Sequence, residues 1–169
     1  MKLWQHLATF VASRPALVDR LIARAERTPY FHIVDSDGSV YMRRWWLMPT
    51  WCLELDDAGH LMPRSWMPFS IRIHHICRPD HDRDLHDHPF NYRTVILRGG
   101  YVEEDIFGDM HVRFEGDTVA ATANTFHRIA HVSDGGVWTL FIMGRRINAW
   151  GFLCGGRKVH WRKYLGVGA

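Results

Sequence analysis

Apolar residues near the beginning of the chain recur at helical spacing. Leu3, Leu7 and Phe10 fall on one side of a helix, and the stretch 15–25 carries a second apolar stripe. Thr28 and Pro29 end this pattern, because the residue before a proline is disfavoured in a helix. We therefore expect residues 1–29 to form a helical segment that packs on the domain that follows.

From Tyr30 onward the apolar pattern changes to the period of two that is typical of β-strands. Turn residues separate many short runs, which indicates an antiparallel sandwich or barrel. Residues 30–169 should thus form one β domain, and the fold class is all-β. Residues 49–68, rich in Pro, Asp and Gly, are expected to be irregular. The predicted strands are 31–34, 40–47, 69–77, 94–98, 101–107, 110–114, 118–121, 126–132, 137–143, 147–153 and 159–164.

Composition excludes several classes of protein. Hydrophobic residues make up 47% of the 169 residues, so a sizeable core is expected. The net charge of +3 comes from scattered basic residues, which argues against a nucleic-acid or anionic-membrane partner. No apolar run reaches the ~18 residues of a membrane span, and the first residues lack the features of a signal peptide. We expect a cytoplasmic location.

The stretch 80–100 contains the most informative pair, His86 and His88. On a strand, residues two apart point to the same face, so both imidazoles can approach one point. Imidazole suits zinc, iron, copper and nickel. A pair of hydrogen-bonded or surface histidines is the alternative. A second stretch, 116–131, adds His127 and His131, which share a face if that strand is regular.

Taken together, the two stretches resemble the motifs of the cupin superfamily, a jelly-roll β-barrel of the RmlC-like kind. The first motif is G(X)5HXH(X)3,4E(X)6G, and the second is G(X)5PXG(X)2H(X)3N. The places of the first motif are filled by Asp80, His86, His88, Arg93 and Gly100. Those of the second are filled by Gly116, Thr122, Asn124, His127 and His131. The HDHPF segment also resembles a group of uncharacterised bacterial and phage cupins.

This resemblance implies a cupin barrel with short N-terminal helices and one divalent metal ion held by His86, His88 and His127. Similarity to three-histidine cupin dioxygenases favours Fe(II), while zinc, nickel or manganese also fits the ligands. A barrel whose metal site has been lost is the alternative. His131 and His74 are not expected to bind the metal directly.

Arg93 stands where the usual cupin has a glutamate ligand, and an arginine cannot bind a metal. If it faces inward, it could hold an anionic substrate beside the metal. The alternative is an ion pair with Asp82, Asp84 or Asp87. His131 is expected to be a pocket residue, so Arg93 and His131 are the candidate substrate-binding residues.

The resulting hypothesis is an iron-dependent oxygenase of the dioxygenase type that acts on a small anionic molecule. A metal-dependent isomerase, lyase or hydrolase would use the same ligands. A non-catalytic ligand-binding or structural cupin is the rival of another class. A homodimer is a possible assembly, whereas nucleic-acid and membrane partners are not expected.

Overall fold

The computed structural model describes residues 2–35, 37–81 and 84–167. Two helices, α1 (Lys2–Ala12) and α2 (Pro15–Ala25), precede the strands, and a short helix α3 (Trp161–Tyr164) follows them. The first strands are β1 (Ile33–Val34), β2 (Val40–Trp46), β3 (Leu53–Leu55), β4 (Leu61–Pro63), β5 (Phe69–Ile76) and β6 (Tyr92–Arg98). The remaining strands are β7 (Gly100–Asp105), β8 (Met110–Phe114), β9 (Thr118–Ala121), β10 (His127–Val132), β11 (Val137–Gly144), β12 (Gly151–Cys154) and β13 (Arg157–His160).

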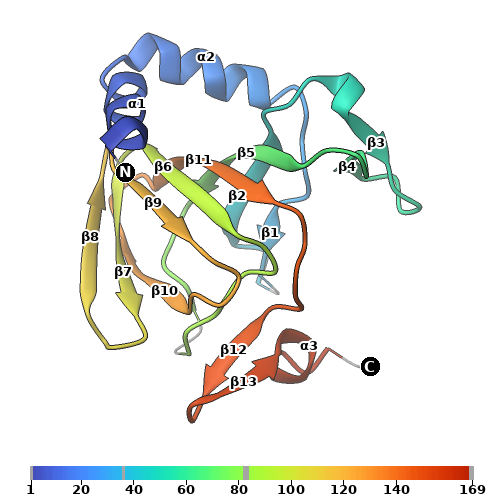
Figure 1. Cartoon of the computed structure of the whole chain (residues 1–169), viewed down its shortest axis with the longest axis vertical. Helices are drawn as coiled ribbons and strands as arrows, with labels where there is room; N and C mark the ends of the chain where they lie inside the picture. Colours follow the sequence, from blue (N-terminus) through green and yellow to red (C-terminus); the bar gives the residue numbers. More distant parts are fainter. Residues whose placement is uncertain (1, 36, 82–83, 168–169) are drawn as a thin grey trace.

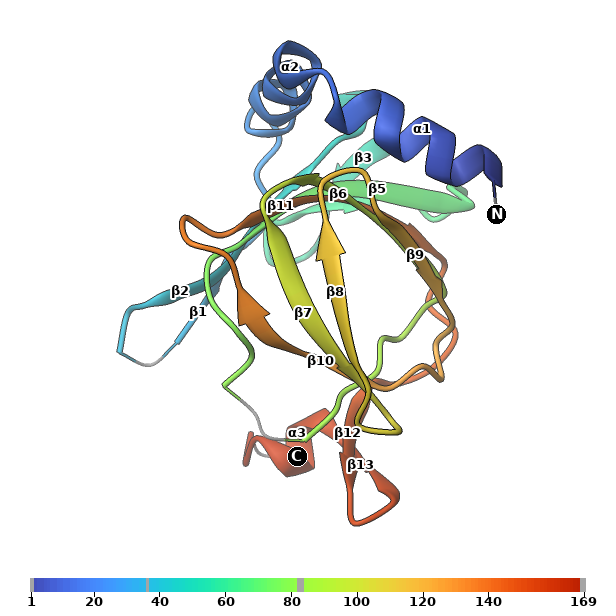
Figure 2. The same ribbon diagram turned by 90° about the vertical axis from the view of Figure 1, so that its left-hand side faces the viewer.

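The strands wrap into a barrel built from antiparallel sheets (Figures 1 and 2). One sheet has six strands in the order β1-β2-β5-β11-β6-β9, and another has three in the order β10-β7-β8. Two short hairpins, β3-β4 and β12-β13, complete the described strands. The predicted all-β barrel class is therefore confirmed.

Helices α1 and α2 lie against the outer face of the six-stranded sheet (Figure 1). Val18 and Ile22 of α2 join one buried cluster with Ile73 of β5 and with Val95 and Leu97 of β6. Each fully buried aliphatic side chain of this kind contributes about 1.5–3 kcal/mol. The packing follows the sequence expectation, while the division into domains at residue 29 stays a prediction.

Strand β6 is buried on both faces, and the alternation of its side chains determines which of them point into the barrel. Tyr92 and Thr94 line the internal cavity. Val95 and Leu97 face the helices instead. Because side chains alternate along a strand, Arg93 shares the outer face with Val95 and Leu97.

The segment after β11 crosses to the end of the barrel opposite α1 and α2 (Figures 1 and 2). The Leu153 N–H donates to the Leu85 carbonyl at 2.8 Å, and the Asp87 N–H donates to the Gly151 carbonyl at 3.1 Å. Asp87 is 1% exposed, accepts the Gly151 N–H at 2.8 Å and pairs with Lys158. These contacts fix the β12-β13 hairpin beside the histidine pair.

Two sequence expectations about local structure are wrong. Residues 49–68 are not irregular throughout, because they contain the 3₁₀ turn Thr50–Cys52 and the β3-β4 hairpin. The hairpin turns at Asp56, whose carboxylate accepts the N–H groups of Ala58 and His60. Residues 161–164 form α3 instead of continuing a strand. Among the described residues, no helix is both long and apolar enough to cross a membrane.

Candidate metal centre

His86 and His88 lie on an extended segment rather than on a regular strand. His86 makes isolated bridges to His127 on one side and to Phe152 on the other. The His86 N–H donates to the His127 carbonyl at 2.8 Å, and the His127 N–H donates back at 2.9 Å. The two sequence motifs are therefore joined through the backbone, which places their side chains at one site.

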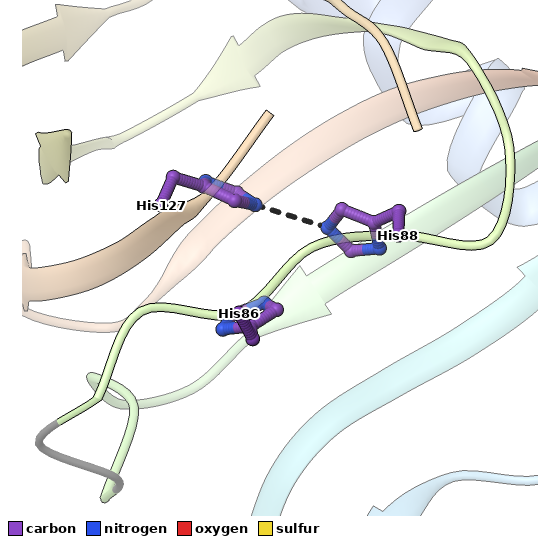
Figure 3. Close-up of side chains that lie close together, drawn as sticks. All are labelled: His86, His88 and His127. Carbon is purple, nitrogen blue, oxygen red and sulfur yellow. Dashed lines mark hydrogen bonds between the residues drawn. The ribbon is translucent and has the colours of Figure 1, made fainter. Parts of the chain in front are cut away.

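The imidazoles of His86, His88 and His127 gather in the barrel interior (Figure 3). One ring nitrogen from each lies within 4.8 Å of the others. The Nε2 atoms of His88 and His127 are 3.0 Å apart. The structure thus brings together the three histidines that the sequence proposed as ligands.

Burial keeps two of these imidazoles neutral. Burial, helped by the neighbouring His127, lowers the pKa of His86 to about 4. Burial also lowers the pKa of His88 well below its ordinary value, again with help from His127 and His86. A metal needs a neutral imidazole with a free lone pair, so these rings are already in the binding state at neutral pH.

Glu103 of β7 orients the third histidine. Its Oε1 atom lies 2.6 Å from Nδ1 of His127, and Arg113 lies 3.5 Å from its other oxygen. Burial alone would raise the pKa of Glu103, but these two partners outweigh burial and lower it. An ionised carboxylate only accepts hydrogen bonds, so Nδ1 of His127 carries the proton in this contact, and Nε2 is the nitrogen that faces His88 and Tyr92.

This donor set fits a divalent transition metal. Two nitrogens that each lie about 2.1 Å from one ion at a right angle are themselves about 3.0 Å apart. That is the separation between the Nε2 atoms of His88 and His127. A carboxylate behind a ligating imidazole, as Glu103 stands behind His127, is the usual support of a histidine ligand.

Tyr92 is a site residue that sequence reasoning missed. Its hydroxyl lies 3.2 Å from Nε2 of His127, and burial raises its pKa well above the ordinary value. The first cupin motif allows three or four residues after the histidine pair. With three, Tyr92 rather than Arg93 falls at the glutamate place, and Gly99 closes the motif as well as Gly100 does.

The histidines open onto an internal cavity of about 600 Å³. This volume falls in the range of roughly 300–1,000 Å³ that is typical of small-molecule sites. Aromatic side chains form much of the wall, including Phe90, Phe141 and Phe152. The cavity therefore suits a small ligand with an apolar part.

The expectation that Arg93 projects into this cavity is wrong. Its guanidinium bonds Thr118 at 3.1 Å and stacks over the ring of Trp4 in α1, 4.8 Å from the centroid. The expected alternative, an internal ion pair, is not formed with Asp84 or Asp87, which bond Tyr164 and Lys158. Asp82 lies outside the described residues. The physical reason is the alternation of β6, which turns residue 93 toward the helices.

The expectation that His131 is a pocket residue is also wrong. The pairing of β10 with β7 shifts between Ile129 and His131, so that Ala130 is an extra residue. This bulge turns His131 to the exposed side. His74, in contrast, lines the cavity and stacks on Phe141 with ring centroids 4.8 Å apart.

Comparison with known proteins identifies the fold. DMSP lyase DddQ from Ruegeria pomeroyi DSS-3 matches with a TM-score of 0.53 and 14% identity, over 82% of this chain and 71% of that one. A structure of HppE in its FeII form matches with a TM-score of 0.50 and 11% identity, over 71% of this chain and 57% of that one. The chain has a β-barrel fold of the cupin type.

A cupin 2 conserved barrel domain protein from Rhodopseudomonas palustris is also similar, with 12% identity, a TM-score of 0.49 and coverage of 76% of this chain and 77% of that one. Neither a family model nor a curated protein sequence matches this chain. The matched structures share its barrel at low identity, and this chain spans 57% to 77% of the length of the three named here. These likenesses therefore concern the fold.

Proposed function

We propose that this cupin is a metal-dependent enzyme that holds one divalent ion with His86, His88 and His127 and acts on a small molecule in the barrel. Fe(II) is the favoured metal and an oxygenase the favoured class. The observation that carries the proposal is the convergence of three imidazoles in the barrel interior, one of them backed by Glu103. The FeII form of HppE, which has a similar fold, supports the choice of iron.

The chain's own residues prepare the site for chemistry. Glu103 fixes the tautomer of His127, and the aromatic wall with Phe141 and Phe152 limits the access of water. Tyr92 holds a proton on a buried hydroxyl next to the histidines. A bound divalent ion would supply a Lewis acid and, as iron, a redox centre.

A metal-dependent lyase is the second candidate. In this reaction the Tyr92 hydroxyl, which lies beside the histidines, would donate its proton to the leaving group. The similar fold of a DMSP lyase supports this alternative. Oxygen consumption separates the two classes. An oxygenase uses dissolved oxygen in proportion to substrate, whereas a lyase converts the same substrate under argon. A non-catalytic binding protein would return every ligand unchanged.

Elemental analysis tests the metal site itself. The protein purified without added metal, and the metal-free protein reloaded with Fe(II), Zn(II), Ni(II) or Mn(II), should bind about one ion per chain. His88→Ala should lose this ion. His131→Ala is the matched control, since it removes an exposed imidazole four residues beyond His127. Stoichiometric metal in His88→Ala would overturn the proposal.

A further inference from the structure

Arg72 of β5 is a buried cation without a counterion among the residues that the structure describes. It is 9% exposed and lines the same cavity as the three histidines. Its Nε atom has no hydrogen-bond partner, and no described carboxylate lies within ion-pair distance of it. Several other arginines in the described chain do have such a partner: Arg78 pairs with Asp35, Arg98 with Asp19, Arg113 with Glu103 and Arg128 with Glu104.

Two aromatic rings hold the Arg72 guanidinium in place. Tyr30 and Trp46 each lie 4.2 Å from it, measured from the guanidinium carbon to the ring centroid. Ring faces attract a cation, and the Tyr30 hydroxyl is a hydrogen-bond partner of Arg72, but neither aromatic residue supplies a negative counter-charge at neutral pH. The guanidinium is therefore oriented before any ligand arrives, while its charge still requires an anion.

His74 and Arg44 stand beside Arg72 on the inner face of the same sheet. His74 follows Arg72 by two residues, so both side chains point inward, and Arg44 pairs with His74 across β2 and β5. The Nε2 atom of His74 is buried and has no hydrogen-bond partner in the described part of the chain. For Arg44, too, no described carboxylate lies within ion-pair distance, and its Nε atom donates to the Phe31 carbonyl.

This polar end of the cavity is adjacent to the histidine cluster. The ring of Phe141 stacks on His74 at 4.8 Å, and the same ring lies 5.9 Å from His88, between centroids. Burial lowers the pKa of Arg72 to about 10, as expected for a cation without a counterion. One small molecule could thus reach from the guanidinium to the histidines.

We propose that the cavity takes a small carboxylate whose anionic group is bound by Arg72, with His74 and Arg44 beside it, and whose remainder extends along Phe141 toward His86, His88 and His127. The planar guanidinium matches the two oxygens of a carboxylate. As a substrate assignment this inference rests on the proposed function, but anion binding itself does not require the metal. Arg72 takes the anchoring role that the sequence had suggested for Arg93.

Metal-free protein is used for the test, so that anion binding is measured apart from metal binding. The protein is titrated with propionate, with its neutral amide propionamide and with inorganic phosphate, by calorimetry and by tryptophan fluorescence, to which Trp46 contributes. Wild type should bind propionate at least tenfold more tightly than propionamide. Equal binding of the two, or no saturable binding of propionate, overturns the proposal. A tenfold preference for phosphate overturns the carboxylate assignment.

Variants locate the anion. Arg72→Met should weaken propionate binding at least tenfold. Arg72→Lys keeps the charge but loses the planar guanidinium, so its affinity for propionate should lie between those of wild type and Arg72→Met. Arg93→Met is the matched control on the outer face of the barrel and should bind like wild type. Unchanged affinity in Arg72→Met contradicts the proposal. If Arg72→Met does not fold, the comparison of acid and amide in wild type still decides.

The two proposals fail separately. Arg72→Met should keep the metal content of wild type, and His88→Ala should lose the metal yet still bind propionate. Loss of propionate preference with intact metal binding would remove only the carboxylate site. Metal retained by His88→Ala, with propionate preference intact, would remove only the proposed metal centre.

Discussion

His86 and His127 exchange two backbone hydrogen bonds, of 2.8 and 2.9 Å, and present their imidazoles on the same side of the pair. The backbone pairing fixes the distance between the two motifs independently of the side chains. A metal ligand set built on such a pair is held in place before the ion binds. His88 completes the set from two residues further along the same extended segment.

Glu103→Gln is predicted to weaken metal binding without unfolding the protein. Glutamine keeps an acceptor near Nδ1 of His127 but loses the negative charge that supports the ring. Loss of such a supporting carboxylate costs about 10- to 100-fold in metal affinity. Competition with a chelator measures the change. Glu104→Gln is the matched control, because Glu104 bonds Arg128 instead; an equal loss in both variants would contradict the role of Glu103.

The pH dependence of stability should report His74. Burial, and then Arg72 and Arg44, lower the pKa of His74 well below the unfolded value of 6.5. The unfolded chain therefore binds this proton first, so the free energy of unfolding is highest above pH 6.5 and falls as the pH decreases below it. In metal-free protein, His74→Gln should reduce this slope between pH 5 and 6.5 by up to about 1.4 kcal/mol per pH unit.

Chemical denaturation of wild type and His74→Gln at several pH values measures that slope. His131→Gln serves as the control, since this imidazole is exposed, and its slope should match wild type. A slope for His74→Gln that equals wild type would mean that His74 is not held neutral by burial. Metal must be absent, because the ion would compete with protons at the other cavity histidines.

The pair formed by Asp87 and Lys158 should respond asymmetrically to substitution. Asp87 is 1% exposed, whereas the side chain of Lys158 is 35% exposed. In Asp87→Asn the lysine regains water, and the amide oxygen can still accept the Gly151 N–H. Lys158→Met instead leaves a buried carboxylate without its cation, which should cost more, about 2–4 kcal/mol. Urea unfolding of both variants at pH 7 gives the order, and the reverse order would contradict the argument.

Gly135 and Gly136 offer a matched test of close packing at the turn before β11. Both have a positive φ, 80° and 84°. A Cβ at Gly135 would meet no atom within 4 Å, whereas at Gly136 it would lie 2.6 Å from the His75 ring and 2.7 Å from the Ile76 carbonyl. Gly135→Ala should cost about 1 kcal/mol for the backbone conformation alone. Gly136→Ala should cost clearly more, and equal melting temperatures would count against this packing.

The spacing of the histidines predicted the cluster, because an extended segment and a strand place alternate side chains in the same way. The same reasoning failed for Arg93. Strand β6 is covered by helices outside and faces the cavity inside, so Val95 and Leu97 are as apolar as Ile96, and the pattern does not reveal which side is inner. The variable gap in the motif then allowed either Tyr92 or Arg93.

His131 and Arg72 depended on information that a single sequence lacks. The bulge at Ala130 is set by the pairing with β7, and the residue types in β10 do not predict it. Arg72 was visible on a predicted strand, but its lack of a counterion emerges only from the folded neighbours. The β3-β4 hairpin, in contrast, could have been predicted from the sequence, since Asp56 and Gly59 are residues typical of a tight turn.

The bridging position of His86 also ties metal capture to folding. The ligand set closes across 39 residues, from His88 to His127. Asp87 meets Gly151 only across 64 residues. Such distant pairings form late and slowly in folding. During refolding, a metal ion would therefore bind only after the barrel has closed. The rate of metal binding would then report the rate of barrel closure.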